Sequence, residues 1–189
     1  MKKILCILLL LLTGCSSKTS MIEIQKHVYV EKEFKDSWLE TNEFGDSYIK
    51  EELQGGYHYH FDQQFLEIFF NTGGKIELYN YSIKKNDLII SGEMIPPKTI
   101  RLVHPHLDNV TSEGVIIHEL GHYFDEKHQF SSSKQFTKLY KKYRTLFNQK
   151  TKKEYFAECF KEYVGGHQEK VKPFHSYMKT ITQKIRQKK

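Results

Sequence analysis

The spacing of the apolar residues changes near residue 110, and this change constrains the fold more than any other feature of the sequence. Before it, short β-type runs predict strands at 21–33, 75–79, 88–90 and 99–103. After it, apolar residues recur at intervals of three and four, which predicts helices at 112–127, 132–148, 151–164 and 171–187. Strands followed by helices predict the α+β class, with a small mixed sheet followed by a helical subdomain.

Two segments between these runs carry weaker local signals. Asp62 is a typical helix N-cap residue, and the apolar positions after it predict a helix that ends at Gly73. From Tyr57 to Phe61 aromatic residues alternate with histidines, as they would on the two faces of a strand. Residues 34–56 are charged and have no clear period, so we predict no element there.

The length and the charge of the chain exclude several classes of protein. A chain of 189 residues is long enough for one domain and short for two. Its 39% hydrophobic residues exclude collagen-like and wholly disordered classes, so one folded core is expected. The formal net charge of +6 falls to +4 without the first fourteen residues, which leaves 27 basic against 23 acidic side chains. We expect no nucleic-acid partner, because this charge is too small to indicate one.

The first fifteen residues resemble the leader of a bacterial lipoprotein. Met1-Lys2-Lys3 is a charged start, and residues 4–12 form an apolar run of about nine residues, where a membrane-spanning helix needs roughly twenty. Leu12-Thr13-Gly14-Cys15 then resembles the box in which the cysteine is acylated after cleavage. The resemblance implies a signal peptide at 1–14, a lipid on Cys15, and a protein anchored at the extracytoplasmic face of the cell membrane. The alternative is an ordinary secretory cleavage site that precedes a cysteine by chance.

This leader also determines which cysteines remain in the folded protein. Cys6 lies in the segment that is removed and Cys15 carries the lipid, so Cys159 is the one thiol that remains. No intramolecular disulfide can then form, and stability must come from the core. We interpret Cys159, which lies between Glu158 and Phe160, as a small buried apolar group and not as a nucleophile.

The motif that carries chemistry is His118-Glu119-Leu120-Gly121-His122. Residues four apart lie on one face of a helix, so both imidazoles can bind one metal ion while Glu119 points toward a water on that ion. Apolar residues flank the motif on both sides, and a histidine pair among them needs polar partners, which zinc supplies. We therefore predict one Zn²⁺ per chain, with His118 and His122 as ligands, and not a chance occurrence of the motif.

A zinc enzyme site needs a third protein ligand and an open fourth position. Glu154 and Glu158 stand one turn apart on a predicted helix, so Glu154 can bind the metal while Glu158 orients an imidazole N–H. In another interpretation, Glu154 only completes a capping box with Thr151. His128 has the metzincin spacing, but Asp125 replaces the glycine which that pattern needs. We favour Glu154 over His128 as the ligand, and we expect Asp125 to be an outer partner of the histidines.

From about residue 57 to residue 185, the chain resembles the zinc metalloprotease domain of anthrax lethal factor and the related bacterial Pro-Pro endopeptidases, a gluzincin-type branch of the zincins. The likeness is carried by residues 118–125 and by Glu154-Tyr155-Phe156-Ala157-Glu158-Cys159-Phe160, in that order. It implies a zincin-like catalytic domain at 57–189, preceded by a tether and N-terminal extension at 15–56. It also implies the metal ligands His118, His122 and Glu154, with Glu119 as the general base.

The chain departs from the family pattern at one position. The family places a catalytic tyrosine seven residues before the glutamate ligand, and this chain has Phe147 there. Tyr143 and Tyr140 lie one and two turns back on the same helical stripe, so either one could replace it. Core packing is the commoner fate of residues on such a stripe.

These features together predict a membrane-tethered, zinc-dependent endopeptidase that hydrolyses a protein or peptide substrate. Zinc lowers the pKa of a bound water toward about 7, and Glu119 takes the proton of that water and passes it to the leaving amine. The competing interpretation is a catalytically inactive lipoprotein that keeps the fold and binds zinc or a partner. Phe147 is the feature that favours this second interpretation.

Overall fold

The structure, a computed structural model, describes residues 20–41, 47–85, 88–104, 113–149 and 151–187. The predicted signal peptide at 1–14 and the predicted lipid attachment at Cys15 lie outside these residues. Within the described ranges, no helix combines the length and the apolar character needed to cross a bilayer.

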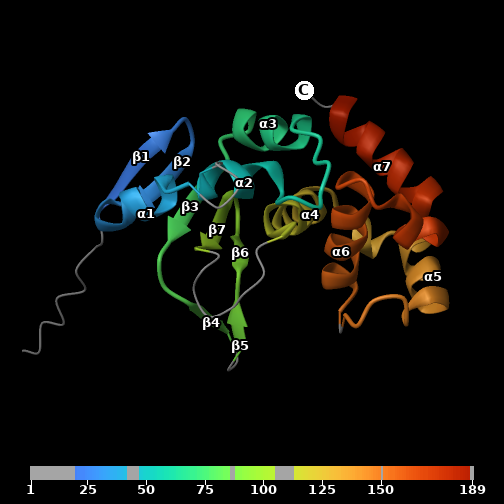
Figure 1. The fold of residues 1–189 in the computed structure, drawn as a ribbon. Coiled ribbons are helices and arrows are strands. Elements are labelled where there is room, and N and C mark those ends of the chain that lie inside the picture. The colour runs from blue at the N-terminus through green and yellow to red at the C-terminus, as the bar shows by residue number, and fades with distance from the viewer. Residues whose placement is uncertain (1–19, 42–46, 86–87, 105–112, 150, 188–189) are drawn as a thin grey trace, which may run out of the picture.

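A five-stranded mixed sheet forms one side of the molecule (Figure 1). Its strand order is β1-β2-β3-β7-β6; β2, β3 and β7 run parallel, and each outer strand runs antiparallel to its neighbour. The strands are β1 (Met21–Gln25), β2 (Val28–Glu31), β3 (Lys75–Tyr79), β6 (Gly92–Ile95) and β7 (Thr99–Val103). A separate hairpin consists of β4 (Ile83–Lys85) and β5 (Leu88–Ile90).

Most of the helices follow the sheet in the sequence and pack beside it. The α-helices of the described residues are α1 (Lys35–Leu39), α2 (Tyr48–Gln54), α3 (Gln64–Asn71), α4 (Val115–His128), α5 (Lys134–Tyr143), α6 (Lys152–Val164) and α7 (His175–Gln187). Three 3-10 segments accompany them, namely η1 (Lys32–Phe34), η2 (Phe130–Ser132) and η3 (Gln168–Phe174). Figure 1 shows α4 between the sheet and the group formed by α5, α6 and α7. The α+β class, with a small mixed sheet followed by helices, is therefore confirmed.

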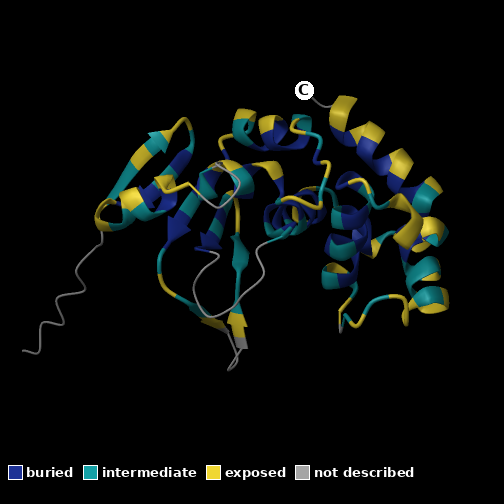
Figure 2. Cartoon of the chain, in the orientation of Figure 1, coloured by how far each residue is buried: buried dark blue, intermediate teal, exposed yellow. Residues whose placement is uncertain are grey.

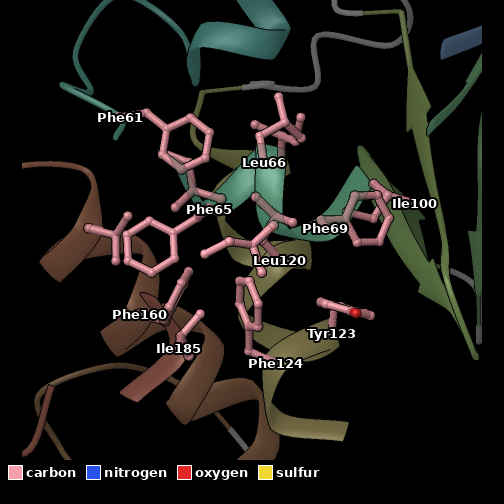
Figure 3. Packing of buried hydrophobic residues seen from close by; sticks show 14 of the residues in the cluster. Phe61, Phe65, Leu66, Phe69, Ile100, Leu120, Tyr123, Phe124, Phe160 and Ile185 are labelled. Carbon is pink, nitrogen blue, oxygen red and sulfur yellow. The ribbon is translucent and has the colours of Figure 1, made fainter. Parts of the chain in front are cut away.

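Three aromatic rings join α3, α4 and α6 into one core (Figure 3). Phe65 of α3 stands edge-on to Phe124 of α4, with ring centroids 6.0 Å apart, and to Phe160 of α6, with centroids 5.4 Å apart. Phe124 and Phe160 also meet, at 5.6 Å. Aromatic pairs at these separations stabilise a fold beyond the area that they bury, so the three rings fix the relative positions of the three helices. Ile100 of β7 belongs to the same cluster and connects it to the sheet.

The predicted strands at 75–79, 88–90 and 99–103 coincide with β3, β5 and β7. The apolar residues at alternate positions of β3 and β7 predict these strands, and they are almost fully buried: Ile76, Leu78, Ile100 and Leu102. The predicted helix at 151–164 matches α6 to within one residue. The predicted strand at 21–33 is instead a hairpin, since β1 and β2 turn at His27, which has a positive φ of 67°.

The expected strand from Tyr57 to Phe61 does not form. His60 donates its backbone N–H to the carbonyl of Gly165 at 2.9 Å, and the ring of Tyr59 packs closely against that glycine. The segment therefore binds the end of α6 and does not pair with a strand. A contact between residues so distant in sequence leaves no trace in the local alternation of residue types.

The structure differs from the prediction in two further regions, one at the end of α5 and one before α3. The helix predicted at 132–148 ends at Tyr143, so Phe147 lies in the connection that follows α5. The region 34–56, for which no element was predicted, contains α1 and α2, which have 5 and 7 residues. Helices of one or two turns are too short for an apolar period to be recognisable.

The structure has no domain boundary at residue 57, where the sequence suggested one. β2 pairs with β3 in the same sheet, and residues before position 57 are buried in the same core as α4 and α6. The buried residues of this part are Val28, Val30, Trp38, Ile49 and Leu53. Residues 20–56 are thus part of the domain and not an appended extension.

This arrangement predicts the behaviour of a shortened chain. A protein that begins at residue 57 loses β1 and β2 and exposes the edge of β3, so we expect it to remain unfolded or to aggregate. A protein that begins at Ser20 keeps the whole sheet and should fold cooperatively. Circular dichroism during thermal unfolding compares the two; a cooperative transition in the shorter chain would restore the boundary at residue 57.

Candidate metal centre

The helix α4 separates its apolar residues from its two histidines. Its core side buries Ile116, Ile117, Leu120, Tyr123 and Phe124, while His118 and His122 line an open cleft. The helix begins after Gly114, whose φ of 72° is left-handed and favours glycine, and the backbone N–H of His118 donates to the Gly114 carbonyl. The spacing of four therefore places both imidazoles on the solvent side of a helix that the core holds rigidly.

The helix α6 contributes the carboxylate that faces them. Thr151 is its N-cap, and the hydroxyl of Thr151 accepts a hydrogen bond from the backbone N–H of Glu154 at 3.2 Å. The capping role of Thr151 is therefore confirmed. The side chain of Glu154 does not complete a capping box, because its Oε2 lies against the histidine pair. The cap and the contact with the histidines thus coexist at one residue.

Three donor atoms meet at one point between the two helices. The Nε2 atoms of His118 and His122 are 3.1 Å apart, and Oε2 of Glu154 lies 3.3 Å from the first and 3.2 Å from the second. In a tetrahedral zinc site with metal–ligand distances of about 2.0–2.1 Å, two ligand atoms are separated by about 3.3 Å. The three residues thus have the donor types and the mutual distances that a zinc ion requires.

His118 is held in place from its other ring nitrogen. Nδ1 of His118 lies 3.2 Å from Oε2 of Glu158, one turn after Glu154, as expected from the sequence. Nζ of Lys161 lies 2.7 Å from the other oxygen of Glu158. Burial opposes the ionisation of Glu158, but hydrogen bonds from His118 and Lys161 outweigh it and lower its pKa. An ionised Glu158 keeps the Nδ1 proton on His118, which directs the Nε2 lone pair toward the site.

Glu119, the predicted general base, is almost fully buried beside the histidines and lines the same cleft. Burial raises the pKa of Glu119. The nearby His118 and His122 lower this pKa in part, and the charge of Glu154 raises it further. The backbone of Met94 in β6 hydrogen-bonds to its carboxylate and favours the charged form. A carboxylate with a raised pKa is suited to take up a proton and to release it again.

The electrostatic field of the site favours a cation between the helices. Hydrogen bonds from the two histidines hold the pKa of Glu154 well below its ordinary value. Burial lowers the pKa of His118, but Glu154, Glu158 and Glu119 outweigh it and raise that pKa to about 9. The negative potential that stabilises a proton on His118 also stabilises a divalent cation in the same position. The donor set and its surroundings therefore fit a metal of the zinc type.

A cleft of about 670 Å³ opens over the three donor atoms. One wall is formed by β6 and the end of β5, and the other wall by α4, the start of α6 and the connection before α6. The residues of the two walls, apart from the donor residues and Glu119, are Ile90, Gly92, Glu93, Met94, Pro96, Asp125, Glu126, Gln149 and Lys153. Among the described residues, β6 is an edge strand of the sheet, and its residues Gly92, Glu93 and Met94 line the cleft.

Two residues that the sequence assigned to the metal site have other partners, although Asp125 does line the cleft. Both carboxylate oxygens of Asp125 accept hydrogen bonds from Ser131, at 2.6 Å from the backbone N–H and 2.7 Å from the hydroxyl. Asp125 therefore fixes the turn after α4 and does not orient an imidazole, which corrects the prediction. His128 packs against the ring of Phe130, with centroids 5.1 Å apart, and does not join the donor group. Of the two rival third ligands, the structure places Glu154 with the histidines.

The tyrosine expected from the family pattern has no substitute at the cleft. Phe147 packs on the ring of Tyr155, with centroids 5.3 Å apart, and Tyr140 does the same at 5.1 Å. The backbone carbonyl of Tyr143 accepts the hydroxyl of Tyr155. Among the described residues, no tyrosine lines the cleft. Burial also raises the pKa of the Cys159 thiol, in agreement with its interpretation as an apolar group.

Three contributors to the site were not predicted from the sequence. Lys161 follows Glu158 by three residues, a spacing that pairs side chains on a helix and could have indicated it. The contact of Met94 with Glu119 and the closeness of α4 to α6 carry no local signal. A Cβ on Gly121 would lie 2.9 Å from Cα of Ala157, so the second variable position of the motif must be small for α6 to approach.

Comparison with known proteins adds no assignment. No protein-family model matches this chain, and no curated protein matches it.

The geometry predicts how the two glutamates of α6 differ in zinc binding. Glu154→Ala should abolish tight binding, because it removes one of three donors, whereas Glu158→Ala should weaken binding by about 10–100-fold as the loss of an orienting partner. His128→Ala, the control, should bind zinc as the unmutated protein does. Isothermal titration with zinc measures all three; loss of binding in His128→Ala with retention in Glu154→Ala would contradict this ligand set.

The close contact at Gly121 gives a second prediction. Gly121→Val adds side-chain atoms where the backbone of α6 lies, so we expect a loss of about 1–3 kcal/mol in the free energy of unfolding. Because the change pushes Glu154 away from the histidines, zinc affinity should fall as well. Gln135→Val, on the exposed side of α5, is the control for the added β-branched residue. Urea unfolding and zinc titration test the two effects, and stability equal to that of the control would refute the tight contact.

Proposed function

We propose that this protein is a zinc-dependent endopeptidase. The observation that carries the proposal is the triangle of donor atoms from His118, His122 and Glu154, with edges of 3.1–3.3 Å, next to a buried Glu119 in an open cleft. Two histidines and a glutamate form one of the ligand sets of catalytic zinc sites, which leave a fourth position free. We also propose that the fold is of the zincin type and belongs with the lethal factor-like metalloproteases, as the sequence resemblance implies.

Bound zinc in such a site lowers the pKa of a coordinated water toward about 7 and polarises a carbonyl oxygen. The residues of the chain supply the proton transfers. Glu119 accepts a proton from the attacking water and then donates it to the nitrogen of the leaving amine. Its raised pKa supports both steps, because the protonated carboxyl is less costly in this buried position than it would be in water.

The edge of β6 is suited to hold the substrate backbone. An extended peptide can add to an exposed sheet edge through main-chain hydrogen bonds, which makes recognition largely independent of side chains. Gly92, Glu93 and Met94 of this strand line the cleft, and Met94 also contacts Glu119. A peptide paired with β6 would therefore pass between the strand and the donor atoms, with a carbonyl near Glu119.

The second candidate function is that of a catalytically inactive, zinc- or partner-binding lipoprotein. The observation that favours it is that Phe147 and Tyr140 pack on Tyr155 and Tyr143 packs on Phe174. No tyrosine of the described residues then lines the cleft. Gln149 and Lys153 are polar residues of the cleft that can donate hydrogen bonds to a developing oxyanion in its place. We favour the enzyme because Glu119 and an open donor face have no evident use in a purely structural zinc site.

We propose that the protein acts on protein or peptide substrates outside the cell membrane, to which a lipid on Cys15 anchors it. The support is the order of residue types at positions 1–15, where a charged start is followed by an apolar run and then by small residues before the cysteine. Two acyl chains on one cysteine would anchor the protein durably.

The function predicts a separation between metal binding and hydrolysis. Glu119→Gln keeps the shape of the side chain and removes the base, so we expect zinc binding close to that of the unmutated protein and a loss of peptide hydrolysis of about 10²-fold or more. Glu126→Gln, one turn beyond His122 on the same cleft, is the matched control and should keep activity within a few-fold. A quenched-fluorescence peptide library measures hydrolysis, with chelation and zinc re-addition as a further check.

Two results would decide against the proposal. Hydrolysis by Glu119→Gln at the rate of the unmutated protein would exclude Glu119 as the base. Zinc binding without any hydrolysis in the unmutated protein, across a library of varied sequence, would support the inactive lipoprotein instead.

A further inference from the structure

The charges of the chain are divided unevenly along its length. Residues 15–126 carry 10 Lys and Arg against 19 Asp and Glu, whereas residues 127–189 carry 17 against 4. The formal charge is therefore −9 for the first part and +13 for the second. The small net charge of the whole chain conceals a strongly basic helical region beside an acidic sheet region, and such a separation creates a directed field.

The few carboxylates of the basic region do not neutralise its surface. Glu154 and Glu158 face His118, and the buried Glu162 pairs with Lys170, so three of the four are engaged elsewhere. Among the described residues, no ion pair joins a carboxylate to a lysine of α5. The outer side of α5, which Figure 2 shows as exposed, therefore presents its positive charge to solvent.

Three lysines of α5 lie in a line. Lys134, Lys138 and Lys141 follow one another at intervals of four and three, so they share one face of the helix, and all three are exposed. Together with the hydroxyl residues Ser132 and Thr137 they line a shallow hollow of about 370 Å³. Cations and hydroxyl groups are the donors that bind carboxylates at a protein surface.

The line continues from α5 to the metal cleft. Nζ of Lys152 donates to the hydroxyl of Thr137 at 3.3 Å, which connects the hollow to the first turn of α6. The next residue, Lys153, lines the cleft and contacts Glu126 at 3.1 Å on its rim. We call the five residues Lys134, Lys138, Lys141, Lys152 and Lys153 the lysine row. It joins the hollow on α5 to the cleft that holds the donor atoms.

We propose that the lysine row binds an acidic segment of the polypeptide substrate, next to the residues that enter the cleft. The proposal rests on the peptidase function proposed above. Lysines three and four residues apart on one helix face are about 4.5–6 Å apart along the axis, and side chains on one side of an extended chain recur at about 6.6–6.8 Å. An extended segment with glutamate or aspartate at alternate positions can therefore place carboxylates near successive lysines.

The shape of the row favours a polypeptide over an anionic bilayer. The row leads from an exposed helix face to the cleft, which a flat membrane surface cannot enter. An extended chain can occupy the hollow and the cleft at the same time. The row then raises the local concentration of acidic substrates at the site, an effect that salt weakens.

The test compares two peptides that share one cleavable sequence and differ in a flanking segment, which alternates serine with glutamate or with glutamine. The neutralised triple variant Lys134→Gln, Lys138→Gln and Lys141→Gln should lower the ratio of kcat/KM for the acidic peptide to that for the neutral peptide by about tenfold, the factor for three exposed ion pairs. The matched control is Lys26→Gln, Lys32→Gln and Lys35→Gln, which removes equal charge from exposed positions of the sheet region. It should keep the ratio of the unmutated protein.

A binding measurement separates this proposal from the proposed function. Fluorescence anisotropy of the labelled acidic peptide on the Glu119→Gln protein needs no turnover, and the α5 triple variant in that background should weaken binding by a similar factor. If binding depends on the three lysines but the unmutated protein cleaves neither peptide, the row is sustained and the peptidase is refuted. Cleavage with an equal ratio in the triple variant and the control would refute the row alone. Binding to phosphatidylglycerol vesicles that the triple variant abolishes, without any preference for the acidic peptide, would show a membrane surface and overturn the proposal.

Discussion

The close contact between α4 and α6 at Gly121 is the constraint on which the candidate site depends. The histidines belong to one helix and Glu154 to the other, so the donor triangle exists only at one separation of the two axes. A hydrogen atom in place of a side chain at Gly121 permits the backbone of Ala157 to come near. The rings of Phe65, Phe124 and Phe160 fix the same separation from the core side. Rigid packing of the two helices therefore keeps the three donor atoms at fixed positions.

The carboxylates around the site differ in environment, and this difference assigns their roles. Glu158 is paired with His118 and Lys161, so it stays ionised and orients the imidazole. Glu154 lies against both histidines, which lower its pKa, so it also remains ionised. Glu119 is the most buried and has a raised pKa, which suits proton transfer. Carboxylates of two helices are therefore distinguished by burial and by partner, a common principle in acid–base sites.

Much of the fold could be predicted, and the parts that could not have a shared physical cause. Strands β3 and β7 and helix α6 have apolar periods that span the whole element, and their predictions are confirmed. The segment from Tyr57 to Phe61 follows a strand-like alternation, yet a backbone hydrogen bond to Gly165, more than a hundred positions away, decides its conformation. The membership of β1 and β2 in the main sheet is likewise set by pairing with β3. Tertiary contacts override local pattern in short segments.

The sequence by itself determined which residues can act, because their relations are local to a helix. A spacing of one and four along one helix sets the relative positions of His118, Glu119 and His122. One turn of α6 does the same for Glu154 and Glu158. Only the tertiary structure decided between Glu154 and His128, paired Asp125 with Ser131 and placed Met94 beside Glu119. It also packed the ring of Tyr140 against Tyr155 and the ring of Tyr143 against Phe174. Each of these outcomes depends on the distance between different elements, which the packing of side chains in the core sets and which no spacing along the chain records.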